Sequence, residues 1–325
     1  MAAARAAGKV AAKGKRSSKL ENMGPFLALA GIVIILSFVS DAFLSVRNIF
    51  NIISQSSVNF TMALGMTVVI ISGGIDLSVG SVMALSGSVM ALLATSLGWH
   101  PAFAILAGIL VGMGVGAFNG FVISRTGIPD FIMTLGMLSA ARGIALIITG
   151  GLPVSGLPEG LTFFGAVRLG GVVPVAGVLA AAVAILVWYI LNYTKLGRYA
   201  FAIGGNREAA RAAGINVGNY KVAFYALIGF TVSMASLIQV GRIYSANPLM
   251  GTGKELEVIA IVIIGGTNLF GGEGSIGGTI VGALIMGVIA NGLNLLNVSS
   301  FWQQFFIGSL IIVVVVVDQL RRRRS

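Results

Sequence analysis

The residues that could do chemistry begin with two glycine patterns typical of nucleotide sites. Residues 272–277 spell G-x-G-x-x-G, a dinucleotide signature only where it joins a strand to a helix and an acid follows about 20 residues later. Here the pattern lies between two apolar stretches, and no carboxylate follows until Asp318. Gly253 and Lys254 resemble the end of a phosphate-binding loop, but Glu255 replaces the required Ser or Thr. We therefore expect no ATPase site in this chain.

Candidates for acid–base or metal chemistry are equally sparse. His100 is the only histidine, and its neighbours Trp99 and Pro101 indicate a membrane-interface position. Glu255 and Glu257 are two residues apart, so they diverge on a helix, and we expect them at the outer mouth. The chain has no cysteine for a thiolate metal site and no recognisable Ser/His/Asp set. We expect no catalytic residue, no metal site and no cofactor bound by this chain.

The composition is typical of a protein surrounded by lipid. Hydrophobic residues make up 57% of the 325 positions, charged residues only 10%, and the mean hydropathy is +0.98. A typical soluble domain has about 25% charged residues and could not bury this much apolar surface. Because about 20 apolar residues cross a bilayer as a helix, the sequence predicts an all-α polytopic membrane protein with about ten transmembrane helices. The expected spans are residues 25–42, 52–72, 78–98, 101–124, 131–149, 173–193, 222–243, 256–271, 276–297 and 301–318.

The eighth of these stretches, residues 256–271, differs from the others. It is short and flanked by glycine, so it is either a full span or a broken, re-entrant one.

The net charge of +11 is distributed in a way that predicts a membrane topology and not a nucleic-acid partner. With a cytoplasmic N-terminus, most of the 21 Lys and Arg residues fall inside, whereas Arg47, Arg168, Arg242 and Lys254 fall outside. An even number of spans also returns the C-terminus to the cytoplasm. The expected cytoplasmic group is Arg5, Lys9, Lys13, Lys15, Arg16, Lys19, Arg125, Lys195, Arg198, Arg207, Arg211, Lys221 and Arg321 to Arg324.

The chain divides into one membrane domain and two basic ends. Residues 1–22 are rich in Ala, Lys, Arg and Ser, which predicts a disordered cytoplasmic leader near anionic lipid. Residues 23–320 form the transmembrane domain, in which residues 150–172 are an external loop and residues 194–221 the longest cytoplasmic segment. Residues 321–325 form a basic cytoplasmic tail.

Two parts of the chain resemble each other in order. Residues 70–77 are similar to residues 263–269, and each is followed by a Gly-Ser pair at a helix start, at 80–81 and 274–275. We interpret this as a parallel internal repeat offset by six helices, an arrangement common in transporters. Separately, Gly108, Gly112, Gly116 and Gly120 form one ridge that predicts close helix packing.

Five polar residues in or beside the spans are candidates for lining a translocation pathway. Asp76 lies beside a predicted helix start, and we expect its carboxylate to cap that helix. Arg142 lies midway through a span, so its guanidinium must face protein, water or a partner. Asn119, Asn291 and Asn294 either line a polar path or bond between helices.

The cytoplasmic segment predicts a short exposed helix. Asn206 is a good N-cap, Glu208 falls in the first turn, and Gly214 can end the helix. Such a two-turn helix has too little apolar surface to bury itself, so it is either a docking site for a partner or only a loop helix.

The residues Glu208-Ala209-Ala210-x-x-x-Gly214 resemble the EAA-x-x-x-G element of permeases of ATP-binding-cassette importers, without that element's later apolar-Pro ending. The runs of residues 72–81 and 196–216, and residues 265–267 and 290–296, resemble the ribose-type branch of monosaccharide permeases, to which the block Gly73-Gly74-Ile75-Asp76-Leu77-Ser78 is quite specific. The resemblance implies that this element is the coupling helix that docks into the ATPase subunit. Its residues would be Asn206, Arg207, Glu208, Ala209, Ala210, Arg211 and Gly214.

The resemblance also implies an assembly in the bacterial inner membrane. Two permease copies would form the pathway, cytoplasmic ATPase modules, separate or fused in tandem, would use ATP and Mg, and a periplasmic binding protein would deliver the sugar. The cargo is expected to be a ribose-like monosaccharide, imported by alternating access. The alternatives are a non-sugar cargo such as an autoinducer, nucleoside or polyol, or an ion-coupled secondary transporter, which usually carries membrane-embedded acids.

Overall fold

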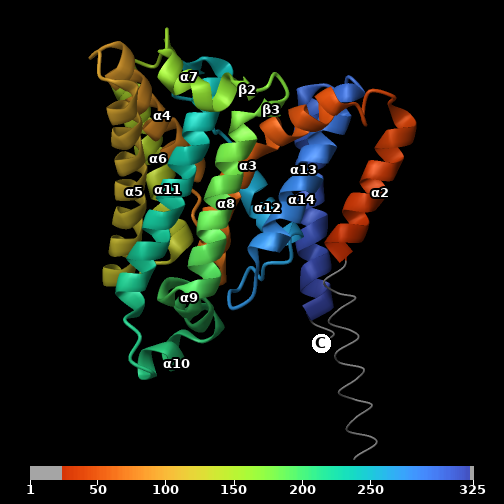
Figure 1. Cartoon of the computed structure of the whole chain (residues 1–325). Coiled ribbons are helices and arrows are strands. Elements are labelled where there is room, and N and C mark those ends of the chain that lie inside the picture. Colours follow the sequence, from red (N-terminus) through yellow and green to blue (C-terminus); the bar gives the residue numbers. More distant parts are fainter. Residues whose placement is uncertain (1–23, 323–325) are drawn as a thin grey trace, which may run out of the picture.

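The structure, a computed structural model, describes residues 24–322 and is built almost entirely of helices (Figure 1). The predicted leader 1–22 lies outside the described residues, as do residues 323–325 of the predicted tail. The helices are α2 (Gly24–Val39), α3 (Val46–Ile71), α4 (Val79–Thr95), α5 (Pro101–Thr126), α6 (Asp130–Thr149), α7 (Glu159–Ala166), α8 (Val175–Tyr193), α9 (Lys195–Gly205), α10 (Arg207–Ala212), α11 (Val217–Ile243), α12 (Lys254–Ile264), α13 (Ile276–Leu295) and α14 (Ser300–Arg322).

Each of the ten predicted spans coincides with a helix, which confirms a multi-pass α-helical membrane protein. Six of these helices, α3, α5, α6, α8, α11 and α13, are long and apolar enough to cross a membrane by the residues that the structure describes. Helix α3 begins six residues earlier than predicted because Ser45 accepts a hydrogen bond from the backbone N–H of Asn48, 3.3 Å away, and so caps the helix.

Helix α12 is the exception among the predicted spans. Its 11 residues extend about 16 Å, roughly half the thickness of the hydrocarbon layer. The backbone turns at Gly265 and Gly266, and Gly266 has a φ of +87°, a conformation that glycine adopts without strain. Of the two alternatives for this stretch, the structure therefore has the broken one.

The predicted external loop 150–172 contains helix α7 and parts of two short antiparallel pairings. β1 (Val154–Ser155) pairs with β4 (Ser245–Ala246), and β2 (Arg168–Leu169) pairs with β3 (Val173–Pro174). Together with α7 they cover one end of the helices, which we call the α7 face (Figure 1).

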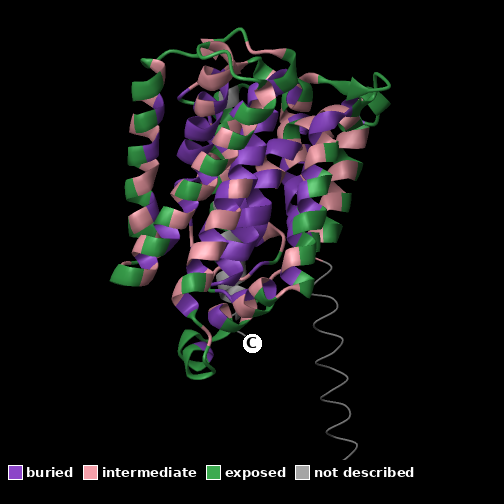
Figure 2. Cartoon of the chain, turned by 60° about the vertical axis from the view of Figure 1, so that its left-hand side comes forward, coloured by how far each residue is buried: buried purple, intermediate pink, exposed green. Residues whose placement is uncertain are grey.

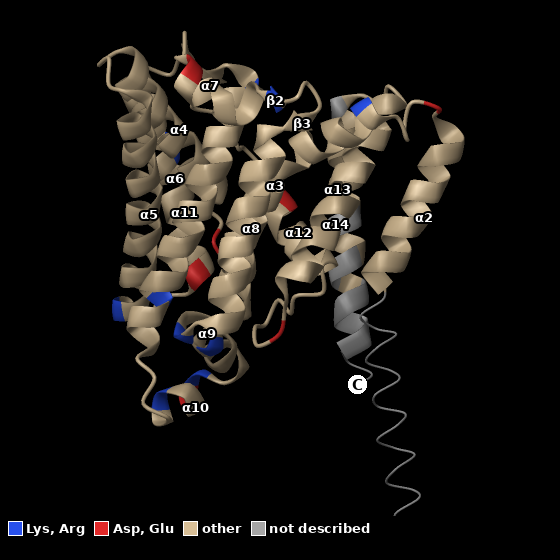
Figure 3. Cartoon of the chain, in the orientation of Figure 1, with Lys and Arg blue, Asp and Glu red and all other residues tan. Residues whose placement is uncertain are grey.

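The opposite end, which we call the α10 face, carries α9 and α10 (Figure 1). Lys and Arg residues gather there, around α9 and α10 and at the nearby ends of α5 and α11 (Figure 3). This is the clustering that the charge pattern predicts for one side of the membrane. The described members of this group are Arg125, Lys195, Arg198, Arg207, Arg211 and Lys221.

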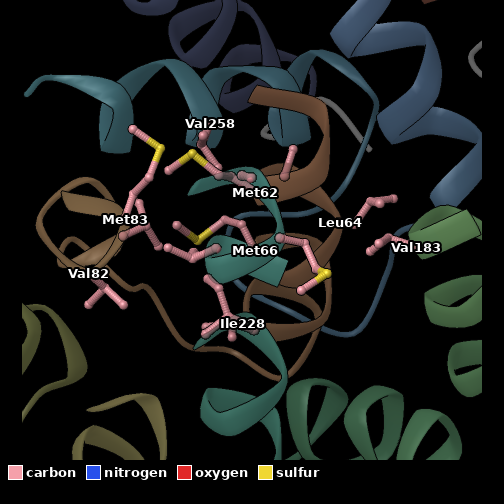
Figure 4. Close-up of a cluster of buried hydrophobic side chains, with 14 of the residues drawn as sticks. Met62, Leu64, Met66, Val82, Met83, Val183, Ile228 and Val258 are labelled. Carbon is pink, nitrogen blue, oxygen red and sulfur yellow. The ribbon is translucent and has the colours of Figure 1, made fainter. Parts of the chain in front are cut away.

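Helices α3 and α11 form the centre of the molecule, and the most buried residues lie along them, whereas exposed residues lie along the periphery (Figure 2). Side chains such as Met62, Met66 and Ile228 are completely buried where the two helices meet α4 and α12 (Figure 4). Long methionine side chains fill irregular gaps between helices, which suits this crossing.

The glycine ridge of α5 packs closely against other helices, as predicted: Gly112, Gly116 and Gly120 against α11, and Gly108 against α4. A Cβ atom at Gly120 would lie 2.7 Å from the Cα of Val222, and one at Gly112 would lie 2.8 Å from the carbonyl oxygen of Gly229. Only glycine permits this approach of the two backbones.

The regions around the two similar segments of the predicted repeat contact each other. The backbone N–H of Gly272, in the turn before α13, donates to the carbonyl oxygen of Ile71 at the end of α3, at 2.9 Å. A second bond joins the hydroxyls of Thr67 and Thr279 at 2.7 Å. Helices α3 and α12 thus lead into glycine-rich turns at the same end of the molecule.

Candidate functional site

Helix α10 is the predicted exposed helix of the cytoplasmic segment, and its first turn is capped. The side-chain oxygen of Asn206 accepts a hydrogen bond from the backbone N–H of Ala209 at 2.9 Å. Glu208 lies in the first turn and forms an ion pair with Arg211 at 3.1 Å. Both charged side chains are more than half exposed, so this pair contributes little to stability and stays accessible.

The end of α10 is equally well defined. Gly214 has a φ of +81°, its N–H donates to the carbonyl oxygen of Arg211, and the N–H of Ile215 donates to that of Ala210. These two bonds form a Schellman motif, which requires a left-handed residue, usually glycine, at this position. Asn206 and Gly214 therefore fix both ends of a six-residue helix, as the sequence predicts.

The surface of α10 is almost entirely exposed. Among Arg207 to Ala212 only Ala210 is buried. Since helices this short do not persist alone in water, α10 depends on its caps and on its contacts with α9 and α11.

Helix α9 connects α10 to the interior through a glycine contact. A Cβ atom at Gly204 would overlap the carbonyl oxygen of Ile71 and lie 2.6 Å from the backbone nitrogen of Gly272. The end of α9 therefore touches the end of α3 and the turn before α13. We call Gly204, Ile71 and Gly272 the glycine junction.

A second connection runs from the start of α11. Lys221 Nζ lies 2.7 Å from Asp130 Oδ1, and both side chains are largely buried. The Tyr225 hydroxyl lies 2.8 Å from Asp130 Oδ2 and 3.1 Å from the carbonyl oxygen of Ile75. The structure shows that Asp130 links α6 and α11 to the non-helical segment 72–78 between α3 and α4.

Asp76 and Asn119, two of the pathway candidates, lie close together and are buried. Asp76 Oδ1 accepts from the backbone N–H of Ser78 at 2.8 Å and from its side-chain hydroxyl at 2.5 Å. Ser78 is itself the N-cap residue of α4 and its side chain does not cap that helix, so Asp76 fixes the turn before α4 and does not accept from the helix's first N–H groups as expected. Asn119 Nδ2 donates to the same hydroxyl at 3.2 Å.

The other three candidates are spread over the molecule. Arg142 Nη1 donates to the carbonyl oxygens of Pro248 at 2.5 Å and Met250 at 2.8 Å, so its guanidinium faces protein. Asn291 exchanges two 2.9 Å hydrogen bonds with Asn48, and Asn294 accepts one from Gln303 at 2.8 Å. In this structure both asparagines bond between helices, one of the two alternatives that the sequence left open.

Sequence reasoning missed a polar cluster halfway along α3. Glu257 Oε2 accepts hydrogen bonds from Asn59 Nδ2 at 2.7 Å and from Lys254 Nζ at 2.6 Å. We call Asn59, Lys254 and Glu257 the mid-depth cluster. Glu257 was expected at the outer mouth, but the broken span places α12 beside the middle of α3. The spacing of Asn51, Gln55 and Asn59, each four residues from the next, was the signal that could have indicated it.

Comparisons with known proteins agree with this architecture. The family model described as the branched-chain amino acid transport system permease component matches residues 48–315. The chain is 44% identical to the ribose import permease protein RbsC of Escherichia coli strain K12, over 85% of this chain and 87% of that protein. It is 41% identical to RbsC of Bacillus subtilis strain 168, over 92% and 93%. It is 39% identical to the D-allose transport system permease protein AlsC of Escherichia coli K12, over 92% of each.

No solved structure matches the chain. The family match covers more than half of the chain, and the relatives span nearly all of it at well above 30% identity. The chain therefore belongs to the family of branched-chain amino acid transport system permease components, and within it is similar to permeases for sugars.

Proposed function

We propose that this chain is the membrane permease subunit of an ATP-driven importer for a ribose-like monosaccharide. The observation that carries the proposal is helix α10, a capped and almost fully exposed helix whose neighbours α9 and α11 each contact the interior. An exposed helix with this architecture is suited to receive a partner and to pass its movement inward.

The proposed assembly contains two copies of this chain in the bacterial inner membrane, each with ten spans and both termini in the cytoplasm. Cytoplasmic ATPase subunits, separate or fused in tandem, bind ATP and Mg and dock on the coupling residues 206–214. A periplasmic binding protein delivers the cargo to the α7 face. The basic α10 face supports this orientation, because positive loops favour the cytoplasm.

The proposed mechanism is alternating access. Closure of the ATPase subunits moves α10, and two contacts pass this movement to the segments between spans. The glycine junction leads to α3 and the turn before α13, and Lys221 leads through Asp130 to segment 72–78. The permease then contributes two alternative helix packings and no covalent chemistry.

The cargo is inferred from the relatives, whose names specify ribose and D-allose. Both are monosaccharides with several hydroxyl groups. A ribose-like sugar is the proposal because the ribose permeases share the higher identity with this chain.

A charge reversal on α10 tests the coupling. Glu208→Arg should abolish both co-purification of the ATPase subunit and ATP-driven uptake of D-ribose in proteoliposomes, because it replaces the one acidic side chain of residues 206–214 with a third basic one. Glu159→Arg is the matched control for co-purification of the ATPase subunit, since Glu159 is also an exposed first-turn carboxylate but lies on α7 at the opposite end. Wild-type uptake and co-purification in Glu208→Arg would contradict the proposed docking. Uptake that survives ATP depletion and stops with a protonophore would instead favour an ion-coupled transporter.

The orientation can be tested with a single introduced thiol. Because the chain has no cysteine, Ala213→Cys would be its only thiol, and Ala213 is exposed beside α10. In intact cells a membrane-impermeant maleimide should leave this position unlabelled until the membrane is opened. Labelling from outside intact cells would place α10 in the periplasm and overturn the proposal.

A further inference from the structure

The mid-depth cluster is an unusual group to find halfway through a membrane protein. It combines a carboxylate, an ammonium group and a carboxamide, contributed by α3 and by the first turn of α12. Ionisable groups at this depth are costly and usually face water or a pathway. The side chains of Lys254 and Glu257 are 32% and 26% exposed, so they are not sealed inside the helix packing.

The depth of the cluster follows from the length of α3. Asn59 is close to the middle of this 26-residue helix. At 1.5 Å per residue it lies about 12 Å further along the helix than Asn51, which is near the α7 face.

A polar stripe connects the cluster to the α7 face. Asn51, Gln55 and Asn59 follow one another at four-residue intervals and so lie on one side of α3. Such a stripe is unexpected on a membrane helix that faces lipid, because each carboxamide would lose its hydrogen bonds with water.

The outer end of this stripe opens into a polar cavity. A cavity of about 240 Å³ is lined by Asn51, Gln55, Arg168 and Arg242, among others. Arg168 Nη2 donates to Asn51 Oδ1 at 2.7 Å. Hydrogen-bonding groups thus continue from the α7 face, along α3, to the cluster.

We infer that the mid-depth cluster of Asn59, Lys254 and Glu257 is a hydroxyl-binding site for the sugar, reached along the stripe of Asn51 and Gln55. This inference rests on the proposed function and adds to it the place where the permease itself contacts its cargo. A sugar hydroxyl donates one hydrogen bond and accepts two. The carboxylate accepts from such a group, whereas the ammonium and carboxamide donate to it, so the cluster matches a pair of neighbouring hydroxyls.

The present contacts within the cluster suit such a site. Asn59 and Lys254 both donate to one oxygen of Glu257, Oε2. Lys254 and Glu257 both belong to the first turn of α12. An incoming polyol exchanges its bonds with water for bonds with groups that already hold one another in position. This lowers the ordering cost of binding.

The first test measures uptake of D-ribose against its concentration. The assay uses the complete complex of permease, ATPase and binding protein in proteoliposomes. Glu257→Gln and Asn59→Leu should each lower uptake about tenfold, the loss expected from one hydrogen bond to a charged group. Asn192→Leu, which replaces an exposed carboxamide near the end of α8 and outside the cluster and the stripe, is the matched control and should match the wild type. Wild-type uptake in both cluster variants would overturn the inference while leaving the proposed function in place. A wild-type complex that imports no sugar would overturn both.

The second test does not depend on a cluster variant that folds. Gln55→Cys leaves Asn59, Lys254 and Glu257 unchanged and introduces the only thiol of the chain, at an exposed position of the stripe. A hydrophilic thiosulfonate reagent should modify this thiol in the complete complex, and saturating D-ribose with the binding protein should slow the reaction severalfold. A thiol that reacts only with lipid-soluble reagents, or at the same rate with and without sugar, would show that the stripe is not the path.

Discussion

Helix α10 and the mid-depth cluster are both small polar groups in an apolar chain, but they are built in opposite ways. The residues that shape α10 lie within nine consecutive positions, from the cap at Asn206 to the left-handed Gly214. The cluster joins Asn59 to Glu257, which are 198 positions apart. The first is shaped by local backbone chemistry, whereas the second exists only after α3 and α12 have packed.

Helix α10 and its connections to the interior should likewise respond differently to substitution. Its own side chains are exposed, so changing them should affect docking far more than stability. Lys221 and Gly204 lie where the segment meets the core, so changing them should affect stability as well. The predictions below test this separation, starting from the largest expected effect.

Replacing Lys221 should destabilise the protein most. In Lys221→Met the carboxylate of Asp130 remains largely buried without its cation. The free energy of unfolding should therefore fall by about 3 kcal/mol. The measurement is the thermal unfolding midpoint of the detergent-solubilised protein. Lys195→Met is the matched control, because Lys195 is an exposed lysine on the same face. Restoration of part of the midpoint in Lys221→Met with Asp130→Asn would confirm the cause, and equal midpoints for the two single variants would contradict it.

This contrast also explains what the sequence could predict. The apolar stretches, the glycine ridge of α5 and both ends of α10 depend on composition, four-residue spacing or a few adjacent residues. The structure has a helix at each apolar stretch, six of them long enough to cross a membrane, and it has the ridge and both helix ends. The role of Asp130 could not be predicted in the same way, because its partners Lys221 and Tyr225 are more than 90 positions away.

The interior polar groups show the same limit. A buried asparagine bonds with whichever helix lies beside it, so no local pattern distinguishes the Asn291 pairing with Asn48 from a position on a pathway. Glu257 was expected at the outer mouth for a related reason. Its depth is set by the break after α12, and the sequence left open whether that stretch was broken.

Replacing Gly204 should have the next largest effect, and replacing the adjacent Gly205 should have almost none. In Gly204→Ala the new Cβ overlaps the carbonyl oxygen of Ile71, and because this is backbone it cannot simply rotate away. The free energy of unfolding should fall by about 2 kcal/mol, a loss typical of overpacking. ATP hydrolysis should also be coupled less tightly to uptake. Gly205→Ala is the control one residue away, since a Cβ there meets no atom within 4 Å.

The readouts are the thermal midpoint and the number of ATP molecules hydrolysed per sugar imported. If the two alanine variants behave alike, the glycine junction is not the connection between α10 and α3. If Gly204→Ala loses stability but keeps its coupling, the junction is only a packing contact.

The smallest and most local effect is expected at Asn206. Asn206→Ala removes the hydrogen bond to the N–H of Ala209 and should cost about 1 kcal/mol. Asn216 is a matched control, because it caps α11 in the same way, accepting from the N–H of Asn219 at 3.1 Å. The two substitutions should remove a similar amount of local helix stability, but they should open different numbers of residues. Helix α10 has six residues and helix α11 has 27, so the same loss opens nearly all of α10 but only the first turn of α11.

Hydrogen exchange measured by mass spectrometry distinguishes these outcomes. Asn206→Ala should speed exchange throughout peptides covering 207–214 and leave the thermal midpoint unchanged, while Asn216→Ala should affect only the first turn of α11. Faster exchange spreading from 206 into α3 would mean that α10 and the core unfold together. The separation between a locally specified docking helix and a tertiary core would then be wrong, because the caps of α10 would be holding the core in place as well.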